Sequence, residues 1–321
     1  MLTEIYDSPG TGKTLTIVEA MRQLLLQNPN TRLLACAPSN TAADIITNRL
    51  KVLGKSVLFR LNSLSRKTED LNKDLHPYAL VNDNGVFAFP PLEELKKYRV
   101  IVTTCISAGV LWGMGFRKGH FSHIFIDEAG QSEEPEIMIP FRTLANDSTN
   151  FVLAGDHRQL SPDIRCEIAK KFELHKSYLK RLMDREIYDV ELGRGLTCVC
   201  SHDGNELILT IPLCRVVKLL KNFRSHEAIL QFSNAHFYNS ELKSCGDPVI
   251  THSLENHEIL PEKKFPIIFH GVAGQDQREE SSPSFFNIDE ATIVKTYCLN
   301  LVSDRKKGTR TSSLLRGPHG S

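Results

Sequence analysis

The first half of the chain alternates short apolar runs with amphipathic segments. We expect buried strands at 2–6, 32–37, 56–60, 100–104, 123–126 and 151–155. The segment 13–27 carries apolar residues at i, i+3, i+4, i+7 and i+8, which predicts a helix, and a second helix is expected over 42–52. Continuous apolar strands separated by helices are typical of a parallel sheet covered on both faces. The pattern therefore predicts an α/β fold.

The second half carries a weaker pattern. Residues 62–98 are polar and irregular, which predicts an excursion from the core. Later in the chain we expect two basic amphipathic helices within 167–189, a loop at 190–206, strands at 215–220 and 266–270, a helix from a Ser225 cap to about Tyr238, and a helix over 289–301. After Ser303 the chain becomes basic and irregular.

The stretch from Asp7 to Thr14 joins the first predicted strand to the first predicted helix. It matches the phosphate-loop pattern G-x-x-x-x-G-K-[ST] except at Asp7, which stands where the first glycine belongs. Gly10 and Gly12 allow backbone N–H groups to close around a phosphate at a helix N-terminus, where the helix dipole favours an anion. Lys13 can reach the β- and γ-phosphates, and the Thr14 hydroxyl can bind Mg²⁺. The alternative is an ordinary glycine-rich turn, which Asp7 keeps open.

Polar residues also follow two later strands, at the edge where open α/β sheets bind ligands. Because side chains alternate along a strand, we expect the carboxylates of Asp127 and Glu128 to point apart. Asp127 can hold Mg²⁺ beside Thr14, and Glu128 can orient and deprotonate a water for attack on the γ-phosphate. Gln159 can sense the γ-phosphate through a hydrogen bond. The competing interpretations are a solvated Asp-Glu loop and a helix-capping glutamine.

A further candidate group lies in the stretch 222–226 at the start of the second half. An arginine from a second domain can complete a nucleotide site built on the first, and such fingers raise the rate by ~10³–10⁵. Arg224 has this place in the chain, and Phe223 beside it could stack on a base. Core packing is the commoner role of any single phenylalanine.

Composition and charge narrow the class of protein. The 321 residues are 41% hydrophobic and 24% charged, as in a globular protein of one large domain or two ordinary ones. The net charge of +1 predicts that any nucleic-acid binding depends on a local groove. The longest uncharged run, 100–116, is too short for a membrane span, and we expect none. Eight cysteines without a C-x-x-C motif indicate reduced thiols and a cytoplasmic protein; a zinc site at Cys198–His202 is a remote alternative.

Several of these stretches together resemble a known family. The segments 9–14, 37–44, 127–131, 155–160 and 222–226 stand in the order of superfamily 1 helicases of the up-frameshift type. More narrowly, 119–130 and 282–287 resemble the Armitage / Moloney leukaemia virus 10 / silencing-defective branch of RNA helicases. The resemblance covers nearly all of residues 8–302, and its motifs are specific in combination.

The resemblance implies a P-loop NTPase with two RecA-like domains, ATP and Mg²⁺ between them, and single-stranded RNA across the top. We accordingly predict a RecA-like ATP-binding domain over 1–165, a helical and loop connector over 166–212, a partial second RecA-like domain over 213–303 and an irregular basic tail over 304–321.

The same resemblance implies a set of site residues. The nucleotide would contact Asp7, Ser8, Pro9, Gly10, Thr11, Gly12, Lys13, Thr14 and Phe223, with Mg²⁺ on Thr14 and Asp127. Catalysis would rest with Glu128, Gln159 and Arg224, and the RNA backbone would contact Pro38, Ser39, Asn40 and Thr104. Known members move 5′ to 3′ in small-RNA silencing and RNA turnover. The expected partners are therefore single-stranded RNA and small-RNA silencing proteins, in the cytoplasm and its ribonucleoprotein granules.

Three departures from the family pattern leave other functions open. Asp7 replaces a glycine, the family's large N-terminal region is absent, and the chain stops before the last two helicase motifs. We therefore expect an incomplete helicase core, which is a fragment of a longer gene product, an imperfect gene model or a degenerate copy. The alternatives are a nucleotide-impaired RNA- or protein-binding relic and a DNA helicase of the same superfamily, because motif spacing does not separate RNA from DNA.

We predict that Asp7→Gly binds ATP more tightly than the natural chain does. An aspartate adds a negative charge near a polyanion, and two unit charges 4 Å apart interact by about 1 kcal/mol in bulk water. The affinity gain should therefore be several-fold and should narrow as salt rises, because salt screens exposed charges. The measurement is ATP affinity of both proteins at low and high salt. Equal affinities at both salts would show that the Asp7 carboxylate does not act on the nucleotide.

Overall fold

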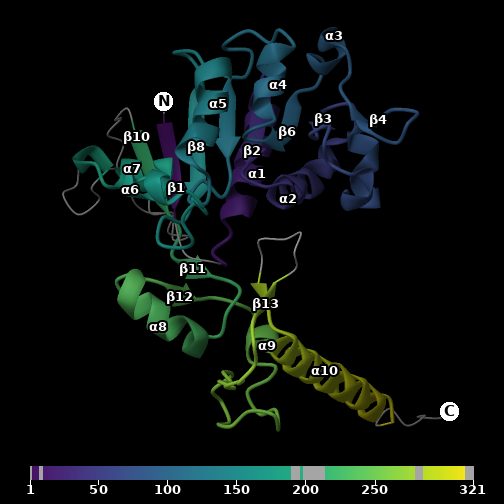
Figure 1. Ribbon diagram of the computed structural model, residues 1–321, viewed down its shortest axis with the longest axis vertical. Coiled ribbons are helices and arrows are strands. Elements are labelled where there is room, and N and C mark those ends of the chain that lie inside the picture. The colour runs from purple at the N-terminus through teal and green to yellow at the C-terminus, as the bar shows by residue number, and fades with distance from the viewer. Residues whose placement is uncertain (1, 7–9, 189–195, 198–213, 279–284, 315–321) are drawn as a thin grey trace, which may run out of the picture. The chain divides into compact units, whose positions relative to one another are not determined.

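The structure of the protein is a computed structural model that describes residues 2–6, 10–188, 196–197, 214–278 and 285–314 (Figure 1). The chain divides into two compact units, Met1–Asn256 and His257–Ser321. The first unit contains the predicted phosphate loop and the stretch 222–226, and it is described first.

An eight-stranded sheet in the order β3-β6-β2-β7-β8-β1-β10-β9 forms the centre of the first unit (Figure 1). Its strands are β1 (Leu2–Tyr6), β2 (Leu33–Ala37), β3 (Leu58–Arg60), β6 (Val100–Thr104), β7 (His123–Ile126), β8 (Asn150–Gly155), β9 (Leu196–Thr197) and β10 (Cys214–Lys218). Every neighbouring pair runs parallel. The predicted parallel α/β sheet is therefore confirmed, and the carboxyl ends of these strands share one edge.

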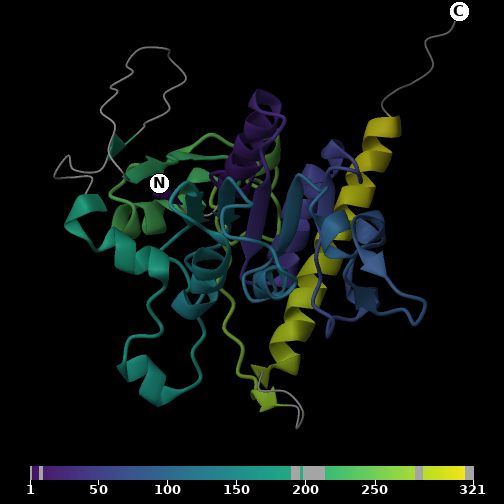
Figure 2. The ribbon, with the colours of Figure 1, turned by 90° about the horizontal axis from the view of Figure 1, so that it is seen from above.

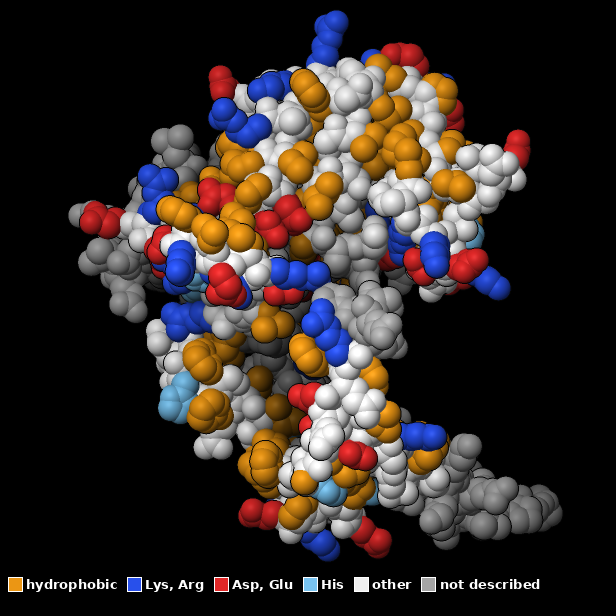
Figure 3. Space-filling model, in the orientation of Figure 1, with side chains coloured by type: hydrophobic (Ala, Val, Ile, Leu, Met, Phe, Trp, Pro, Cys, Tyr) orange, Lys and Arg blue, Asp and Glu red, His pale blue; other side chains and the backbone are white. Residues whose placement is uncertain are grey.

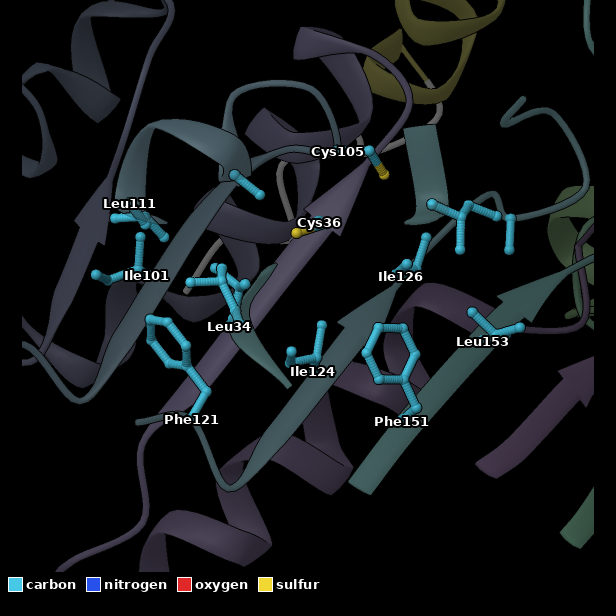
Figure 4. Packing of buried hydrophobic residues seen from close by; sticks show 14 of the residues in the cluster. Leu34, Cys36, Ile101, Cys105, Leu111, Phe121, Ile124, Ile126, Phe151 and Leu153 are labelled. Carbon is cyan, nitrogen blue, oxygen red and sulfur yellow. The ribbon is translucent and has the colours of Figure 1, made fainter. Parts of the chain in front are cut away.

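Helices cover both faces of this sheet (Figure 2). Buried side chains of α1 (Lys13–Gln27) and α2 (Asn40–Leu50) pack on one face. Those of α4 (Ala108–Gly113), α5 (Glu134–Leu144) and α7 (Tyr178–Met183) pack on the other. Side chains alternate along each strand, so β2 sends Leu33 to the first face and Leu34 to the second. The second of these cores is drawn in Figure 4.

The loops after β7 and β8 approach each other more closely than side chains would allow. A Cβ built on Gly130 would lie 2.4 Å from the backbone oxygen of Asp156, and one built on Gly155 would lie 2.7 Å from the nitrogen of Gly130. The nitrogen of Ala129 donates to the oxygen of Ala154 at 2.8 Å, which extends the pairing past the strand ends. Glycine is therefore a packing requirement at both positions.

The excursion expected between β3 and β6 lies outside the main sheet. Its elements are the 3₁₀ turns η2 (Thr68–Asp70) and η3 (Lys73–Tyr78), the antiparallel pair β4 (Leu80–Val81) and β5 (Phe87–Ala88), and α3 (Leu92–Leu95). A further 3₁₀ turn, η1 (Lys51–Leu53), precedes β3. Three buried side chains, Leu71, Leu75 and Phe87, give it a small core of its own.

The segment after β8 differs from the prediction in the pairing of β10. The expected helices within 167–189 are present as α6 (Glu167–Lys171) and α7, followed by η4 (Glu186–Tyr188). However, β10 pairs with β1 in the main sheet, so no boundary between compact units falls at 212. Most of the predicted loop 190–206, including Cys198–His202, lies outside the described residues.

The predicted helix after Ser225 is present as α8 (Glu227–Phe237), but its cap was predicted wrongly. His226 is the N-cap, and its Nδ1 accepts from the nitrogen of Ala228 at 3.1 Å. A histidine nitrogen can serve as the cap acceptor when the proton is on the other ring nitrogen. The remaining elements of this unit are β11 (Lys221–Asn222), β12 (Lys243–Ser244) and α9 (Pro248–Thr251).

The second unit contains the antiparallel pair β13 (Gln277–Arg278) and β14 (Phe285–Phe286), and the helix α10 (Ile288–Leu314). The expected helix over 289–301 is confirmed, and it extends through residues 304–314, where we had predicted an irregular tail. The buried strand predicted at 266–270 is wrong, since this segment forms no strand and Phe269 is 96% exposed. An apolar run becomes a buried strand only with neighbouring strands, and the described part of this unit pairs none with it.

None of the helices in the described ranges has both the length and the apolar character that a membrane span requires.

We predict that Gly130→Ala destabilises the protein and that Gly113→Ala does not. The added methyl group of Gly130→Ala meets backbone of the β8 loop, and such overpacking costs about 1–3 kcal/mol. Gly113 is helical, and a Cβ there meets nothing within 4 Å, so the matched variant should be neutral or slightly stabilising. Urea unfolding of both variants is the measurement, and equal midpoints would contradict the close approach described above.

Candidate functional site

The carboxyl edge of the main sheet brings the predicted site residues to neighbouring strand ends. β1 lies beside β8, and β7 separates β8 from β2. The phosphate loop follows β1, the Asp127–Glu128 pair follows β7, and Gln159 follows β8. The parallel pairing therefore gathers segments that lie far apart in sequence.

Two glycines shape the described part of the phosphate loop. Gly10 has φ 84° and Gly12 has φ 93°, a left-handed region that suits glycine. Gly12 is the N-cap of α1, which begins at Lys13, so the loop ends at a helix N-terminus as predicted. Thr11 and Lys13 are buried, at 6% and 9% exposure. Asp7, Ser8 and Pro9 lie outside the described residues.

The stretch 222–224 lies directly against this loop. The nitrogen of Phe223 donates to the oxygen of Gly10 at 2.9 Å, and a Cβ on Gly10 would lie 2.6 Å from the Cβ of Arg224. Buried Asn222 shapes the turn, because its Oδ1 accepts from the nitrogens of Arg224 at 3.0 Å and Ser225 at 2.8 Å. Phe223 and Arg224 are exposed beside the loop. Sequence reasoning did not single out Asn222. An asparagine side chain that accepts from backbone N–H groups two and three residues later is a known turn signal.

Thr14 and Asp127 meet beneath the loop. The Thr14 hydroxyl donates to Oδ2 of Asp127 at 2.7 Å, and the nitrogen of Glu128 donates to Oδ1 at 3.0 Å. Burial raises the pKa of the Asp127 carboxyl from its ordinary value of 3.8 to about 6, against the opposing effect of the Thr14 hydrogen bond. A hydroxyl and a carboxylate at this distance fit the oxygen ligands with which proteins hold Mg²⁺ beside phosphate groups.

Glu128 has an unusual backbone conformation, and the expected strand alternation does not apply to it. β7 ends at Ile126, and Glu128 has φ 54°, a left-handed conformation that is uncommon for a residue with a side chain. Its Oε2 accepts from Nε2 of Gln131 at 3.3 Å. Outliers of this kind cluster at functional sites. Neither residue lies within the strand, so strand alternation does not set the directions of the two carboxylates.

Gln159 bonds to an aspartate that sequence reasoning did not select. Its Nε2 donates to Oδ2 of Asp156 at 2.5 Å. Oδ2 of Asp156 also accepts from the hydroxyl of Tyr238, at 2.7 Å, and Oδ1 accepts from the nitrogen of Arg158 at 2.9 Å. Asp156 is 3% exposed and links the β8 loop to the end of α8. A lone aspartate after a strand carries no signal of such a link.

The residues predicted to contact RNA follow the adjacent strands β2 and β6, where Ala37 is paired with Thr104. Ser39 is exposed and caps α2 by accepting from the nitrogen of Ala42 at 3.2 Å. Asn40 is the first residue of α2, and Pro38 lies next to Ser39. The Thr104 hydroxyl donates to Oγ of Ser107 at 3.0 Å. The structure therefore groups all four predicted positions at one part of the edge.

His226, His252 and Glu255 form a polar cluster beside α8. Nε2 of His226 and Oε1 of Glu255 are 2.9 Å apart. Because Nδ1 of His226 accepts the cap bond, Nε2 carries the proton and donates to Glu255. The His252 ring lies 4.5 Å from the His226 ring, centre to centre. With its proton in this place, Nε2 of His226 has no lone pair for a metal ion.

Comparison with known families gives two matches along the chain. Two family models, each described as an AAA domain, match residues 1–66 with 88–165 and residues 206–313. The gap in the first match falls on the excursion between β3 and β6. The chain thus carries the nucleotide-binding domain type that the glycine loop indicates.

Several curated proteins are similar to most of the chain. RNA helicase Mov10l1 of Homo sapiens is 42% identical over 297 residues, covering 92% of this chain and 23% of that protein. Putative helicase mov-10-B.1 of Danio rerio is 41% identical over 311 residues, covering 95% and 29%. Probable RNA helicase armi of Drosophila melanogaster is 30% identical over 338 residues, covering 94% and 27%. The chain spans about a quarter of the length of these relatives.

The same assignment follows from the order of the motifs, the parallel sheet, the two AAA matches and the relatives. The chain belongs to the superfamily 1 helicases of the up-frameshift type, in the branch of Armitage and the MOV-10 proteins.

We predict that Asp127→Asn stabilises the protein without nucleotide and metal, by an amount that depends on pH. The pKa of the Asp127 carboxyl is 3.8 in the unfolded chain and about 6 in the folded protein. The free energy of unfolding is therefore highest below pH 3.8 and falls by about 3 kcal/mol as the pH rises through 6. An asparagine has no charge to desolvate. The melting temperature of the variant should therefore exceed that of the natural chain at pH 8, and the gap should shrink towards pH 4. A gap that does not change with pH would contradict the raised pKa.

Proposed function

We propose that this chain is the ATPase core of an ATP-dependent RNA helicase. The observation that carries the proposal is the contact of Thr14 with Asp127, 2.7 Å between oxygens, beneath a glycine loop at the N-terminus of α1. Phosphate binding uses such loops, and Mg²⁺ uses such an oxygen pair. Relatives at 42% and 30% identity are named RNA helicases, which supports the choice of reaction.

In this proposal the loop residues bind the ATP phosphates, and Thr14 and Asp127 hold Mg²⁺. The metal ion would supply positive charge to neutralise the phosphate oxygens. Lys13, at the first turn of α1, adds a cation beside the γ-phosphate. Arg224 lies against the same loop through the Gly10 contact and supplies a second cation to the transferring group.

Glu128 has the general-base role. Its backbone is left-handed, and the side-chain amide of Gln131 donates to one of its carboxylate oxygens. The carboxylate can accept a proton from the water that attacks the γ-phosphate. Gln159 is bonded to Asp156, and through it to Tyr238, so a change at Gln159 reaches the end of α8.

Single-stranded RNA is the proposed substrate, bound where β2 and β6 end. Pro38, Ser39, Asn40 and Thr104 lie together there, next to the strand that leads to Asp127. Lys and Arg are interspersed with Asp and Glu on the surface drawn in Figure 3, so binding depends on local groups. We further propose 5′ to 3′ movement, a role in RNA silencing or turnover with small-RNA silencing proteins as partners, and a cytoplasmic location. The names of the relatives support RNA as the substrate, and the other assignments follow from the family resemblance.

We predict that Glu128→Gln retains ATP binding while hydrolysis falls about hundredfold or more, because loss of a general base costs roughly 10²–10⁴ in rate. Lys13→Ala should instead lose ATP binding. The measurements are fluorescent-nucleotide binding and phosphate release with single-stranded oligouridine present.

The matched control is Glu133→Gln, which changes the next glutamate along the chain. Its hydrolysis should stay within about twofold of the natural chain, since the rate effect belongs to the base alone. Equal hydrolysis by the natural chain and Glu128→Gln would remove Glu128 from the mechanism. A natural chain that binds no nucleotide would favour a nucleotide-impaired relic.

A further inference from the structure

A fully buried arginine lies beneath the proposed RNA-binding edge. Arg60 ends β3, and its side chain is 0% exposed. All of its donor nitrogens have acceptors: Nε donates to Oδ1 of Asp44 at 2.9 Å, Nη1 to the oxygen of Leu61 at 2.7 Å, and Nη2 to Oδ1 of Asn40 at 3.0 Å. A charge this deeply buried must be well paired to be tolerated.

This contact decides which way the Asn40 amide faces. A guanidinium group has donors and no acceptor, so the Asn40 atom that faces Nη2 is the oxygen. The amide nitrogen must therefore face away from Arg60. Among the described residues, that nitrogen has no hydrogen-bond partner, and Asn40 is only partly buried. Asn40 thus presents a donor at the sheet edge.

A second arginine keeps the arrangement rigid. Arg66 donates to both carboxylate oxygens of Asp44, at 3.0 and 2.6 Å, and Nη1 also donates to Oδ1 of Asn62 at 2.8 Å. Asp44 lies one helical turn after Asn40, so both face β3 from the same side of α2. Two guanidinium charges share one carboxylate, which leaves the group net positive.

We propose that Arg60 is a positioning residue for RNA binding, which orients Asn40 so that its amide nitrogen donates to a backbone phosphate oxygen. The inference rests on the proposed function, since it assigns the phosphate contact at the same edge. Phosphate oxygens accept from asparagine amides in nucleic-acid complexes, and such contacts carry affinity without sequence preference. Arg60 itself does not touch the RNA.

The experiment is a double-mutant cycle on the full 321-residue chain, with fluorescein-labelled oligouridine as the probe. The four proteins are the natural chain, Arg60→Lys, Asn40→Ala and the double variant. A lysine keeps the charge but has no fork to bond Asn40 and Asp44 together. Arg60→Lys should weaken binding about tenfold when Asn40 is present, the value of one hydrogen bond to a charged group. In the Asn40→Ala background, the same change should weaken binding by less than about twofold.

A matched control separates positioning from general support of the fold. Arg66→Lys alters a second arginine that bonds Asp44 but not Asn40. We expect it to leave oligouridine affinity within about twofold, because the Asn40 amide keeps its partner. A tenfold loss by both lysine variants, or equal losses by Arg60→Lys with and without Asn40, would overturn the inference.

A further variant, Asn40→Asp, tests the inference if Arg60→Lys does not fold. In Asn40→Asp, an oxygen still accepts from Arg60 and the outward atom becomes an acceptor. The melting temperature of Asn40→Asp should equal or exceed that of the natural chain. Its affinity for oligouridine should fall by about tenfold or more, because the amide donor is lost and the new carboxylate repels the phosphate. Unchanged affinity in Asn40→Asp would overturn the inference and leave the helicase proposal intact. A natural chain that hydrolyses ATP but binds no oligouridine would overturn both the RNA assignment and this inference.

Discussion

Parallel pairing of every neighbouring strand is the constraint on which the proposed site depends. In such a sheet all the strands end at the same edge, so the polar residue after each strand meets those of its neighbours. The β1–β8 and β7–β8 pairs bring the glycine loop and Asp127 together, and Gly130 and Gly155 let the loops after β7 and β8 close on each other. The chemistry of the edge is thus a product of backbone pairing, and a side chain at either glycine would disturb it.

The buried charges of Arg60 and Asp127 at this edge differ in their hydrogen bonding, and the difference fits the roles proposed for them. Arg60 has an acceptor for each of its donor nitrogens, although burial still lowers the pKa of its guanidinium group. Asp127 receives two hydrogen bonds yet has its pKa raised to about 6 by burial, so its charge is not fully compensated. An under-compensated carboxylate gains from a cation, whereas a satisfied guanidinium holds its neighbours in place.

Sequence reasoning was accurate where one local pattern decides the outcome. The α1 helix has the predicted bounds Lys13–Gln27, and the strands of the first half are present, because apolar period and length determine them. It was wrong where a distant partner decides. Nothing local predicts that His226 rather than Ser225 caps α8, that β10 joins the sheet of β1, or that Asp156 links Gln159 to Tyr238. The apolar run 266–270 shows the converse, since a strand pattern without paired neighbours is not a strand.

The hydrogen bond between Phe223 and Gly10 couples binding at the glycine loop to the position of the segment 222–224. A molecule that binds the glycine loop and displaces Gly10 must stretch this bond, so its binding free energy includes the strength of the bond. Linkage between two equilibria is reciprocal. If a displacement of the segment 222–224 changes the affinity of the loop by some factor, binding at the loop changes the equilibrium constant of that displacement by the same factor. This backbone contact, together with the hydrogen bond between Asp156 and Tyr238 and the pairing of β1 with β10, therefore couples the segments that the two AAA models match.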